Sequence, residues 1–257
     1  MNSMSSIKSS KLTGNIIVPG DKSISHRALI IGSLVSGKIK ITNLLESDDV
    51  IATANALKLL GLKINKTKTF WEIFGNGIGN LSGSNFRLEM GNSGTGSRLL
   101  MGLIAGSDVE ATFLGDDSLS KRPMKRIIIP LLKTGAHFDD PNNNNLPITI
   151  RGNKIPLPIE YISPVASAQI KSSILLAGLS STGNTIVIEP TLSRDHTENM
   201  LRFLGAKIST IQLPDSSWKI TLEGLPSLKT LDIEIPSDPS SAAFPIVASI
   251  ITPNSHI

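Results

Sequence analysis

The chain has 257 residues, of which 40% are hydrophobic and 18% charged, a composition typical of a globular protein with one large or two ordinary domains. It contains no cysteine, which excludes disulfides, thiolate catalysis and cysteine-based metal sites, and its sequence lacks the run of about 18 apolar residues that a membrane span needs. The net charge of +4 suits anionic partners, and because aromatic residues for base stacking are scarce, we expect small phosphorylated molecules and no nucleic acid.

Three segments of the chain follow one plan. They are Ser25–Ile64, Thr95–Phe138 and Ser167–Ile208. In each, an apolar helix rich in small residues precedes a β-branched strand, and a polar stretch then opens a second, amphipathic helix that leads into another strand. This alternation predicts an α/β fold made of repeated units.

Glycines mark the predicted helix ends in all three segments. Glycine is the usual residue where a helix closes in a left-handed conformation. We expect the first helices to end at Gly37, Gly106 and Gly183. We expect the second helices to end at Gly61, Gly135 and Gly205.

A fourth segment begins with a helical pattern at Ser240–Ile251, but the sequence ends before a second helix. A half repeat leaves an apolar face uncovered and sheet edges unpaired, so we expect the sequence to be a fragment of a longer protein.

Proline-rich crossings bracket the three complete repeats, at Pro19-Gly20 and at Pro236–Pro239. The predicted division assigns 1–20 to the first strand of a split second domain. It assigns 21–235 to a three-repeat substrate-binding domain and 236–257 to the truncated start of the second domain.

Hydroxyl groups and cations recur where the first helix of each segment starts. Lys22-Ser23, Gly94-Thr95 and Ser167 all stand at such a start, and Arg27, Arg98 and Lys171 follow within the next turn. A helix N-terminus offers free N–H groups and the positive end of the helix dipole, so it favours an anion. One alternative is that these are ordinary serine-capped, solvated helix starts. If the repeats pack around a pseudo-threefold axis, however, the three helix starts converge on one anion site.

Five motifs in this order resemble the 5-enolpyruvylshikimate-3-phosphate synthase family: GDKSISHR, GNSGTGSRLL, GDDSLSKRPM, SAQIKSS and RDHTE. The last two have the form of its class II branch, and the resemblance runs from about Leu12 to the end of the sequence. It implies an inside-out α/β barrel of repeated βαβαββ-like units, with one complete three-repeat domain and a fragment of a second. It also implies transfer of the enolpyruvyl group of phosphoenolpyruvate to the 5-hydroxyl of shikimate 3-phosphate, in aromatic amino acid biosynthesis. The resemblance implies no metal or organic cofactor and, as in many family members, a monomer. The absence of cysteine and of a secretory segment separately predicts a cytoplasmic location.

The resemblance also assigns residue roles. Lys22 matches the family lysine beside the reacting carbon, so it is the catalytic candidate and a phosphoenolpyruvate contact. The other matches to phosphoenolpyruvate contacts are Asn92, Gly94, Thr95 and Arg122. The matches to shikimate 3-phosphate contacts are Ser23, Arg27, Ser167, Ala168, Gln169 and Arg194.

Several of these side chains allow a second interpretation. Arg27 has the geometry to grip a carboxylate through two hydrogen bonds, whereas Arg194 is also spaced to pair with Glu198 along one helix face. His26 and His196 are interpreted as structural histidines with satisfied hydrogen bonds rather than as general bases. Arg98 and Lys171 are interpreted as residues that orient the substrate loops.

The resemblance has three further implications. Some class II members carry Ala at the position of Gly94, so glycine there predicts sensitivity of the intact enzyme to glyphosate. The family takes further catalytic carboxylates and arginines from its second domain, so we expect no turnover and weak shikimate 3-phosphate binding by this chain alone.

Two alternative functions remain. The first is a non-catalytic binding half of a split enzyme. The second is an enolpyruvyl transferase acting on UDP-N-acetylglucosamine, against which the absence of cysteine argues.

Overall fold

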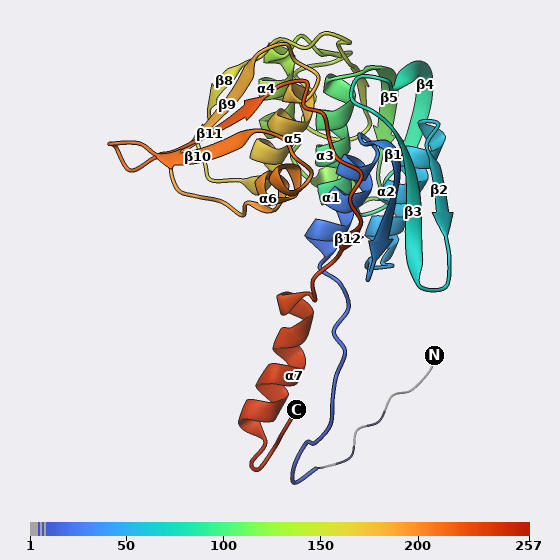
Figure 1. Cartoon of the computed structure of the whole chain (residues 1–257), viewed down its shortest axis with the longest axis vertical. Coiled ribbons are helices and arrows are strands. Elements are labelled where there is room, and N and C mark those ends of the chain that lie inside the picture. Colours follow the sequence, from blue (N-terminus) through green and yellow to red (C-terminus); the bar gives the residue numbers. More distant parts are fainter. Residues whose placement is uncertain (1–4, 6, 8) are drawn as a thin grey trace.

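Three four-stranded sheets surround a group of central helices in the described part of the chain (Figure 1). The computed structural model describes residues 5, 7 and 9–257, so part of the predicted 1–20 segment lies outside the described residues. Residues 22–76 form α1 (Lys22–Gly32), β1 (Ser36–Thr42), α2 (Asp48–Leu59), β2 (Lys63–Lys66) and β3 (Phe70–Asn76). Residues 82–151 form β4 (Ser82–Glu89), α3 (Gly94–Ala105), β5 (Asp108–Leu114), a 3₁₀ turn (Leu119–Lys121), α4 (Lys125–Lys133), β6 (His137–Phe138) and β7 (Ile148–Arg151). Residues 160–251 form β8 (Glu160–Ile162), α5 (Ala168–Gly178), β9 (Asn184–Glu189), α6 (His196–Phe203), β10 (Ile208–Gln212), β11 (Trp218–Glu223), β12 (Ile233–Glu234) and α7 (Pro239–Ile251).

The three sheets share one strand order. They read β12-β1-β3-β2, β4-β5-β7-β6 and β8-β9-β11-β10, and in each the first pair of strands is parallel and the others are antiparallel. Each unit is therefore βαβαββ, as predicted. The first unit takes its first strand from the far end of the three repeats, because Ile233 of β12 pairs with Ile41 of β1.

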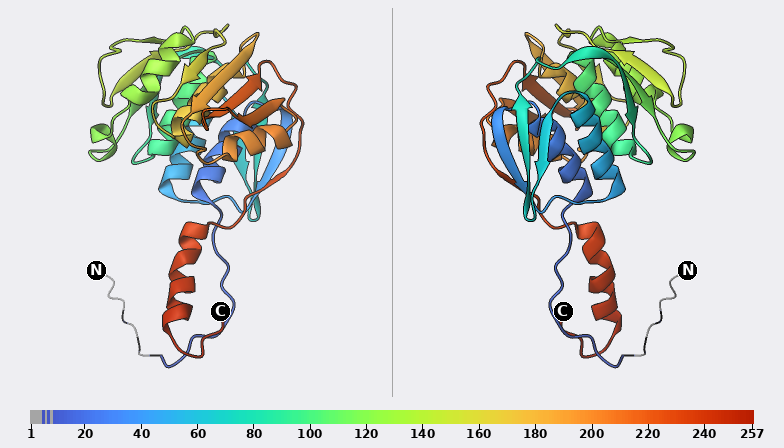
Figure 2. Two further views of the ribbon diagram at one scale, coloured as in Figure 1. Left: turned by 90° about the vertical axis from the view of Figure 1, so that its left-hand side faces the viewer. Right: turned by 90° about the vertical axis from the view of Figure 1, so that its right-hand side faces the viewer.

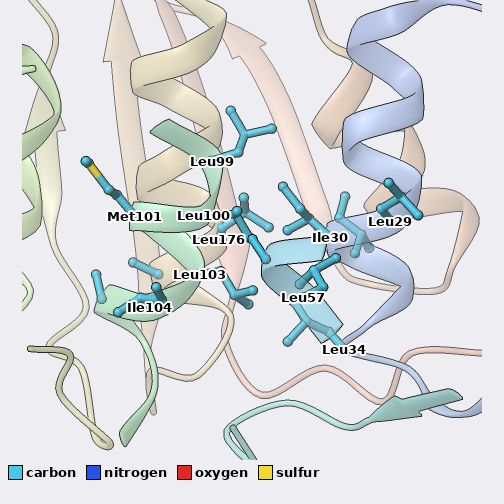
Figure 3. Packing of buried hydrophobic residues seen from close by; sticks show 14 of the residues in the cluster. Leu29, Ile30, Leu34, Leu57, Leu99, Leu100, Met101, Leu103, Ile104 and Leu176 are labelled. Carbon is cyan, nitrogen blue, oxygen red and sulfur yellow. The ribbon is translucent and has the colours of Figure 1, made fainter. Parts of the chain in front are cut away.

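The helices α1, α3 and α5 form the interior. Figure 3 shows Leu99 to Ile104 of α3 beside Leu176 of α5, with Ile30 of α1 and Leu57 of α2 on the other side. Helix α3 is buried along almost its whole length, as expected of a helix that is apolar all round. A Cβ atom on Gly102 would lie 2.3 Å from the carbonyl oxygen of Ser173, so α3 and α5 meet backbone to backbone. Helices inside and sheets outside confirm the predicted inside-out α/β arrangement.

The second helices end as predicted. Gly61, Gly135 and Gly205 follow α2, α4 and α6 with φ angles of 91°, 89° and 96°, which is the region where glycine avoids the steric cost of a Cβ. The sequence signal was strong here because the chain must reverse at once into a strand.

The predicted ends of the first helices are right at one position and wrong at two. Helix α3 ends with Gly106 as its C-cap, as predicted, although a φ of −98° is not the left-handed conformation that was expected. Gly37 lies inside β1 and Gly183 lies beyond the end of α5 at Gly178, so neither ends its helix. At α1 the last carbonyls accept hydrogen bonds from Leu34 and Val35 in tight turns, so no left-handed residue is needed.

Helix α7 and the segment before α1 extend away from the three-sheet body (Figure 2). The helix predicted at Ser240–Ile251 is confirmed, and none of its residues is buried. The N–H of Asp21 bonds to the carbonyl of Pro236, and the N–H of Asp238 bonds to the carbonyl of Pro19, so the two crossing segments lie side by side. Among the described residues, the helices are too short or too polar to cross a membrane.

Candidate functional site

A polar cavity of about 540 Å³ lies where α1, α3, α5 and α6 begin. Its walls come from these four helix starts, from the first turn of α4 and from the loop that follows β9. The lining residues are Ser23, Arg27, Thr95, Arg126, Ala166, Ser167, Ala168, Gln169, Ser193, Arg194 and His196. The structure thus brings together all six predicted shikimate 3-phosphate positions with Thr95, which the sequence assigned to the neighbouring phosphoenolpyruvate loop.

The helix starts are fixed by their caps. The carboxylate of Asp21 accepts a hydrogen bond from the N–H of Ile24 at 2.8 Å, and the hydroxyl of Ser167 accepts one from the N–H of Ile170 at 3.5 Å. An acidic residue, rather than a serine, therefore caps α1. These caps leave the first turns of α1 and α5 facing the cavity with Ser23 and Ala168.

Arg27 is held rigidly at the cavity wall. It is 3% exposed, and its Nε and Nη2 donate to the hydroxyls of Thr197 and Ser172 at 2.7 and 2.9 Å, while Nη1 donates to the carbonyl of Ser23 at 2.9 Å. The edge of the guanidinium that usually grips a carboxylate through Nε and Nη2 is therefore occupied, and a ligand meets the remaining N–H groups of Nη1 and Nη2. Burial lowers the pKa of Arg27 to about 10, so the side chain stays charged at neutral pH.

Gln169 connects two parts of the site. Its Nε2 donates to the hydroxyl of Thr95 at 3.0 Å, and its Oε1 accepts from Arg98 at 3.2 Å and from Arg126 at 3.1 Å. Arg98 is almost fully buried, and burial together with the nearby Arg126 and Arg122 lowers its pKa to about 10. These contacts agree with the interpretation of Arg98 as a residue that orients the loops, because it binds Gln169 and the carbonyls of Gly94 and Pro123 and does not line the cavity.

The four predicted residues that do not line this cavity are Lys22, Asn92, Gly94 and Arg122. Lys22 points toward Asp49, with its Nζ 3.0 Å from the carboxylate in a half-exposed ion pair. Arg122 donates to Asn92, whose amide in turn donates to Asp116 at 2.8 Å.

Gly94 links this second group to the cavity. A Cβ atom on Gly94 would lie 2.9 Å from Nη1 of Arg98 and 3.1 Å from Nη1 of Arg122. The predicted phosphoenolpyruvate residues therefore form an adjacent cationic strip along the start of α3, and Arg98 connects this strip to Gln169.

The comparisons with known proteins identify the family. Residues 7–257 match the family described as EPSP synthase (3-phosphoshikimate 1-carboxyvinyltransferase). The chain belongs to the EPSP synthase family. Its sequence is 51% identical to the 3-phosphoshikimate 1-carboxyvinyltransferase of Parvibaculum lavamentivorans, over all of this chain and 57% of that protein. It is 49% identical to the protein of the same name from Rhodospirillum rubrum, over 97% of this chain and 56% of that protein.

A solved structure agrees with the family assignment. The EPSP synthase of Acinetobacter baumannii superposes with a TM-score of 0.86 and 41% identity, over 95% of this chain and 54% of that chain. The chain thus spans a little more than half the length of the relatives it matches. This likeness confirms both the resemblance and the fold inferred from the five motifs.

The EPSP synthase motifs contain cavity residues that sequence reasoning missed. Ser193 directly precedes the RDHTE motif, and Arg126 stands four residues after Arg122 in the KRPMKR stretch. His196 was interpreted as a structural histidine with satisfied hydrogen bonds, but it lines the cavity, and its buried Nδ1 has no partner among the described residues. No sequence pattern distinguished Arg126 from Arg122, because the backbone is extended at Arg122 and α4 begins only at Lys125. Ser193 carried no signal of its own, because a serine before a helix is most simply read as a cap.

Two alternative interpretations can now be decided. Glu198 does not pair with Arg194; its carboxylate lies 2.7 Å from Nζ of Lys171, because Arg194 precedes α6 and turns into the cavity. His26 is fully buried, with its Nδ1 2.8 Å from the hydroxyl of Thr53, and burial lowers its pKa to about 4. Its place away from the cavity agrees with a structural role, but the expectation of satisfied hydrogen bonds is wrong, because its buried Nε2 has no partner among the described residues. No group of three metal-binding side chains occurs among the described residues.

Proposed function

We propose that this chain supplies the shikimate 3-phosphate site and part of the phosphoenolpyruvate site of an EPSP synthase. In the proposed reaction, the 5-hydroxyl of shikimate 3-phosphate loses its proton as its oxygen bonds to C2 of phosphoenolpyruvate, and C3 gains a proton. The C2–O bond to phosphate then breaks as C3 loses a proton, which gives the enolpyruvyl ether and inorganic phosphate. The observation that carries the proposal is the cavity in which Arg27, Arg126 and Arg194 meet the hydroxyls of Ser23 and Ser167.

The chemistry of this cavity suits a small, highly charged anion. Guanidinium groups and hydroxyls at helix N-termini bind phosphate and carboxylate oxygens, and partial burial strengthens these bonds relative to water. Because Arg27 is already fixed by three bonds within the chain, little side-chain freedom is lost when it binds a ligand. Ala168 offers a flat apolar contact beside these groups, as a carbon ring requires.

Phosphoenolpyruvate is proposed to bind along the strip that runs from Lys22 past Gly94 to Arg122. The half-exposed Lys22–Asp49 ion pair contributes little free energy, so the ammonium is free to turn toward a substrate anion. There it would stabilise charge that develops at the reacting carbon and take part in proton transfer.

The space at Gly94 supports the proposed glyphosate sensitivity. A methyl group there would press on Arg98 and Arg122, whereas glycine leaves both guanidinium groups in place for an anionic inhibitor. The measurement is inhibition of a full-length enzyme that contains this sequence, compared with its Gly94→Ala variant. Micromolar inhibition that is lost in the variant supports the proposal, and millimolar tolerance of the unaltered enzyme refutes it.

Because the chain covers 57% of its Parvibaculum relative, we propose ligand binding by this chain and turnover only in a longer polypeptide or with a complementary chain. A split enzyme therefore remains an alternative. We further propose a cytoplasmic location and, for the longer polypeptide, a monomeric state.

The proposed function is tested by titration of shikimate 3-phosphate into the purified chain, followed by calorimetry. Arg194→Ala should weaken binding by about tenfold, which corresponds to one lost hydrogen bond to a charged group. Arg151→Ala is the matched control, because Arg151 is an exposed arginine on β7 that pairs with Glu110 away from the cavity. Equal affinity of the Arg194→Ala variant and the unaltered chain would refute the assigned site.

A further inference from the structure

A buried cluster of three charged side chains lies behind the cavity. Lys171 of α5, Glu189 at the end of β9 and Glu198 of α6 are each 1% exposed. The Nζ of Lys171 is 2.8 Å from Glu189 and 2.7 Å from Glu198. None of the three side chains lines the cavity, so direct binding of substrate does not account for them.

One residue of the cavity wall is attached to this cluster by all its polar groups. The N–H and the hydroxyl of Ser193 donate to the two carboxylate oxygens of Glu189 at 2.9 and 2.7 Å. The carbonyl of Ser193 accepts a hydrogen bond from Nζ of Lys171 at 3.3 Å. Ser193 therefore cannot rotate or shift without breaking bonds to buried charges.

The attachment matters because Ser193 stands in the loop between β9 and α6, next to Arg194. Pro190 to Asp195 form neither helix nor strand, and Ser193 and Arg194 line the cavity. A buried charge is costly unless it is paired and hydrogen-bonded. The hydrogen bonds that Glu189 accepts besides its ion pair with Lys171 both come from Ser193 in this loop. By contrast, the Glu198 carboxylate meets only Lys171 among the described residues.

We propose that Lys171 and Glu189 are positioning residues that hold Ser193 and Arg194 at the cavity wall before any ligand arrives. A loop that is already ordered spares an incoming anion the entropic cost of ordering it, so the cluster raises affinity without touching the ligand. The inference rests on the proposed function only for the identity of that anion, shikimate 3-phosphate.

The cluster offers its own matched variants. Glu189→Met removes the acceptors of Ser193 and leaves a balanced Lys171–Glu198 pair. Glu198→Met removes the other carboxylate and leaves a balanced Lys171–Glu189 pair, with every bond to Ser193 intact. Glu189→Gln is the conservative variant, because its amide can still accept from the N–H of Ser193 and bond to the hydroxyl.

Two readouts separate the inference from the proposed function. The first is hydrogen exchange of the Ser193 N–H by NMR in the ligand-free chain. Exchange should be much faster in Glu189→Met, unchanged in Glu198→Met and partly restored in Glu189→Gln. The second is titration of shikimate 3-phosphate, for which Glu189→Met should raise Kd by about tenfold and Glu198→Met should not.

Unchanged exchange of Ser193 in a folded Glu189→Met variant would overturn the inference. If Glu189→Met does not fold, the same comparison is made on Glu189→Asp, which keeps the charge but shortens its reach, and unchanged exchange there has the same meaning. If exchange responds as expected but the unaltered chain binds no shikimate 3-phosphate, the positioning stands and the proposed ligand is wrong.

Discussion

Buried polar side chains at this site are hydrogen-bonded to one another before any ligand binds. Arg27, Ser172 and Thr197 form a closed set of hydrogen bonds between α1, α5 and α6. Such networks fix geometry because breaking one bond leaves a buried donor or acceptor without a partner. The exposed members of the site, Arg126 and Arg194, have more freedom and depend on neighbours such as Gln169 for their orientation.

His26 gives this rigidity a dependence on pH. Burial lowers its pKa from 6.5 to about 4, opposed by Asp49 and reinforced by Arg27 and Lys22. Between these pH values the unfolded chain binds a proton at this residue that the folded chain does not, so stability falls as the pH falls. The free energy of unfolding should fall by about 3 kcal/mol in total as the pH drops through this range.

The measurement is the free energy of unfolding in urea at about pH 4.5 and about pH 7. His26→Gln should flatten the difference between the two values, whereas His137→Gln, at an exposed position on β6, should leave it as in the unaltered chain. Equal pH dependence in His26→Gln and the unaltered chain would show that another group dominates.

At the residue scale, the sequence predicted best where a motif and a helix start coincide. Ser23, Ser167 and Gln169 reached the cavity because capping fixes the first turn of a helix. The partner of Glu198 was beyond prediction, since Lys171 lies on another helix and spacing along one chain identifies only neighbours on the same element.

At the scale of elements, the close contact of α3 with α5 sets how the helix starts converge. Gly102 and Gly106 allow the backbones to touch at Ser173 and Ala177. The sequence showed that these helices carry small residues, but it did not show which helix packs against them, because that depends on the order of the sheets. That order was only partly predictable, because β12 joins β1 across the whole domain.

Gly102→Val should therefore destabilise the fold by about 3 kcal/mol, because its side chain would overlap the backbone of Ser173 and force α3 away from α5. The check is the urea midpoint of unfolding. Asn55→Val adds the same side chain to the exposed face of α2 and should change stability by no more than about 0.5 kcal/mol. Similar effects of the two substitutions would mean that the helices separate at little cost.

For the whole molecule, the most unusual surface is α7. Phe244, Ile250 and Ile251 are 80%, 75% and 73% exposed, on a helix without a packed face. Exposed apolar surface of this kind favours association.

The chain should therefore self-associate as its concentration rises, which light scattering measures directly. Phe244→Ser combined with Ile250→Ser should reduce this association strongly. Ile162→Ser, which removes an isoleucine that is 70% exposed on β8, should not. If the scattering of all three proteins rises equally, association involves a surface other than α7.

The strand β12 also has a consequence for how the protein is made. Directly before β12, the carboxylate of Asp232 accepts a hydrogen bond from the N–H of Lys40 in β1, a contact that spans 192 residues. A ribosome adds about 5–20 residues per second, so β1 waits about 10–40 s for its parallel neighbour. During that time the second and third sheets can form from their own repeats, while the first sheet keeps an open edge beside β1. The repeat that is synthesised first is therefore the last to be completed. Until β12 pairs with it, the open edge of β1 is where a chaperone or a strand of another chain would bind the nascent chain.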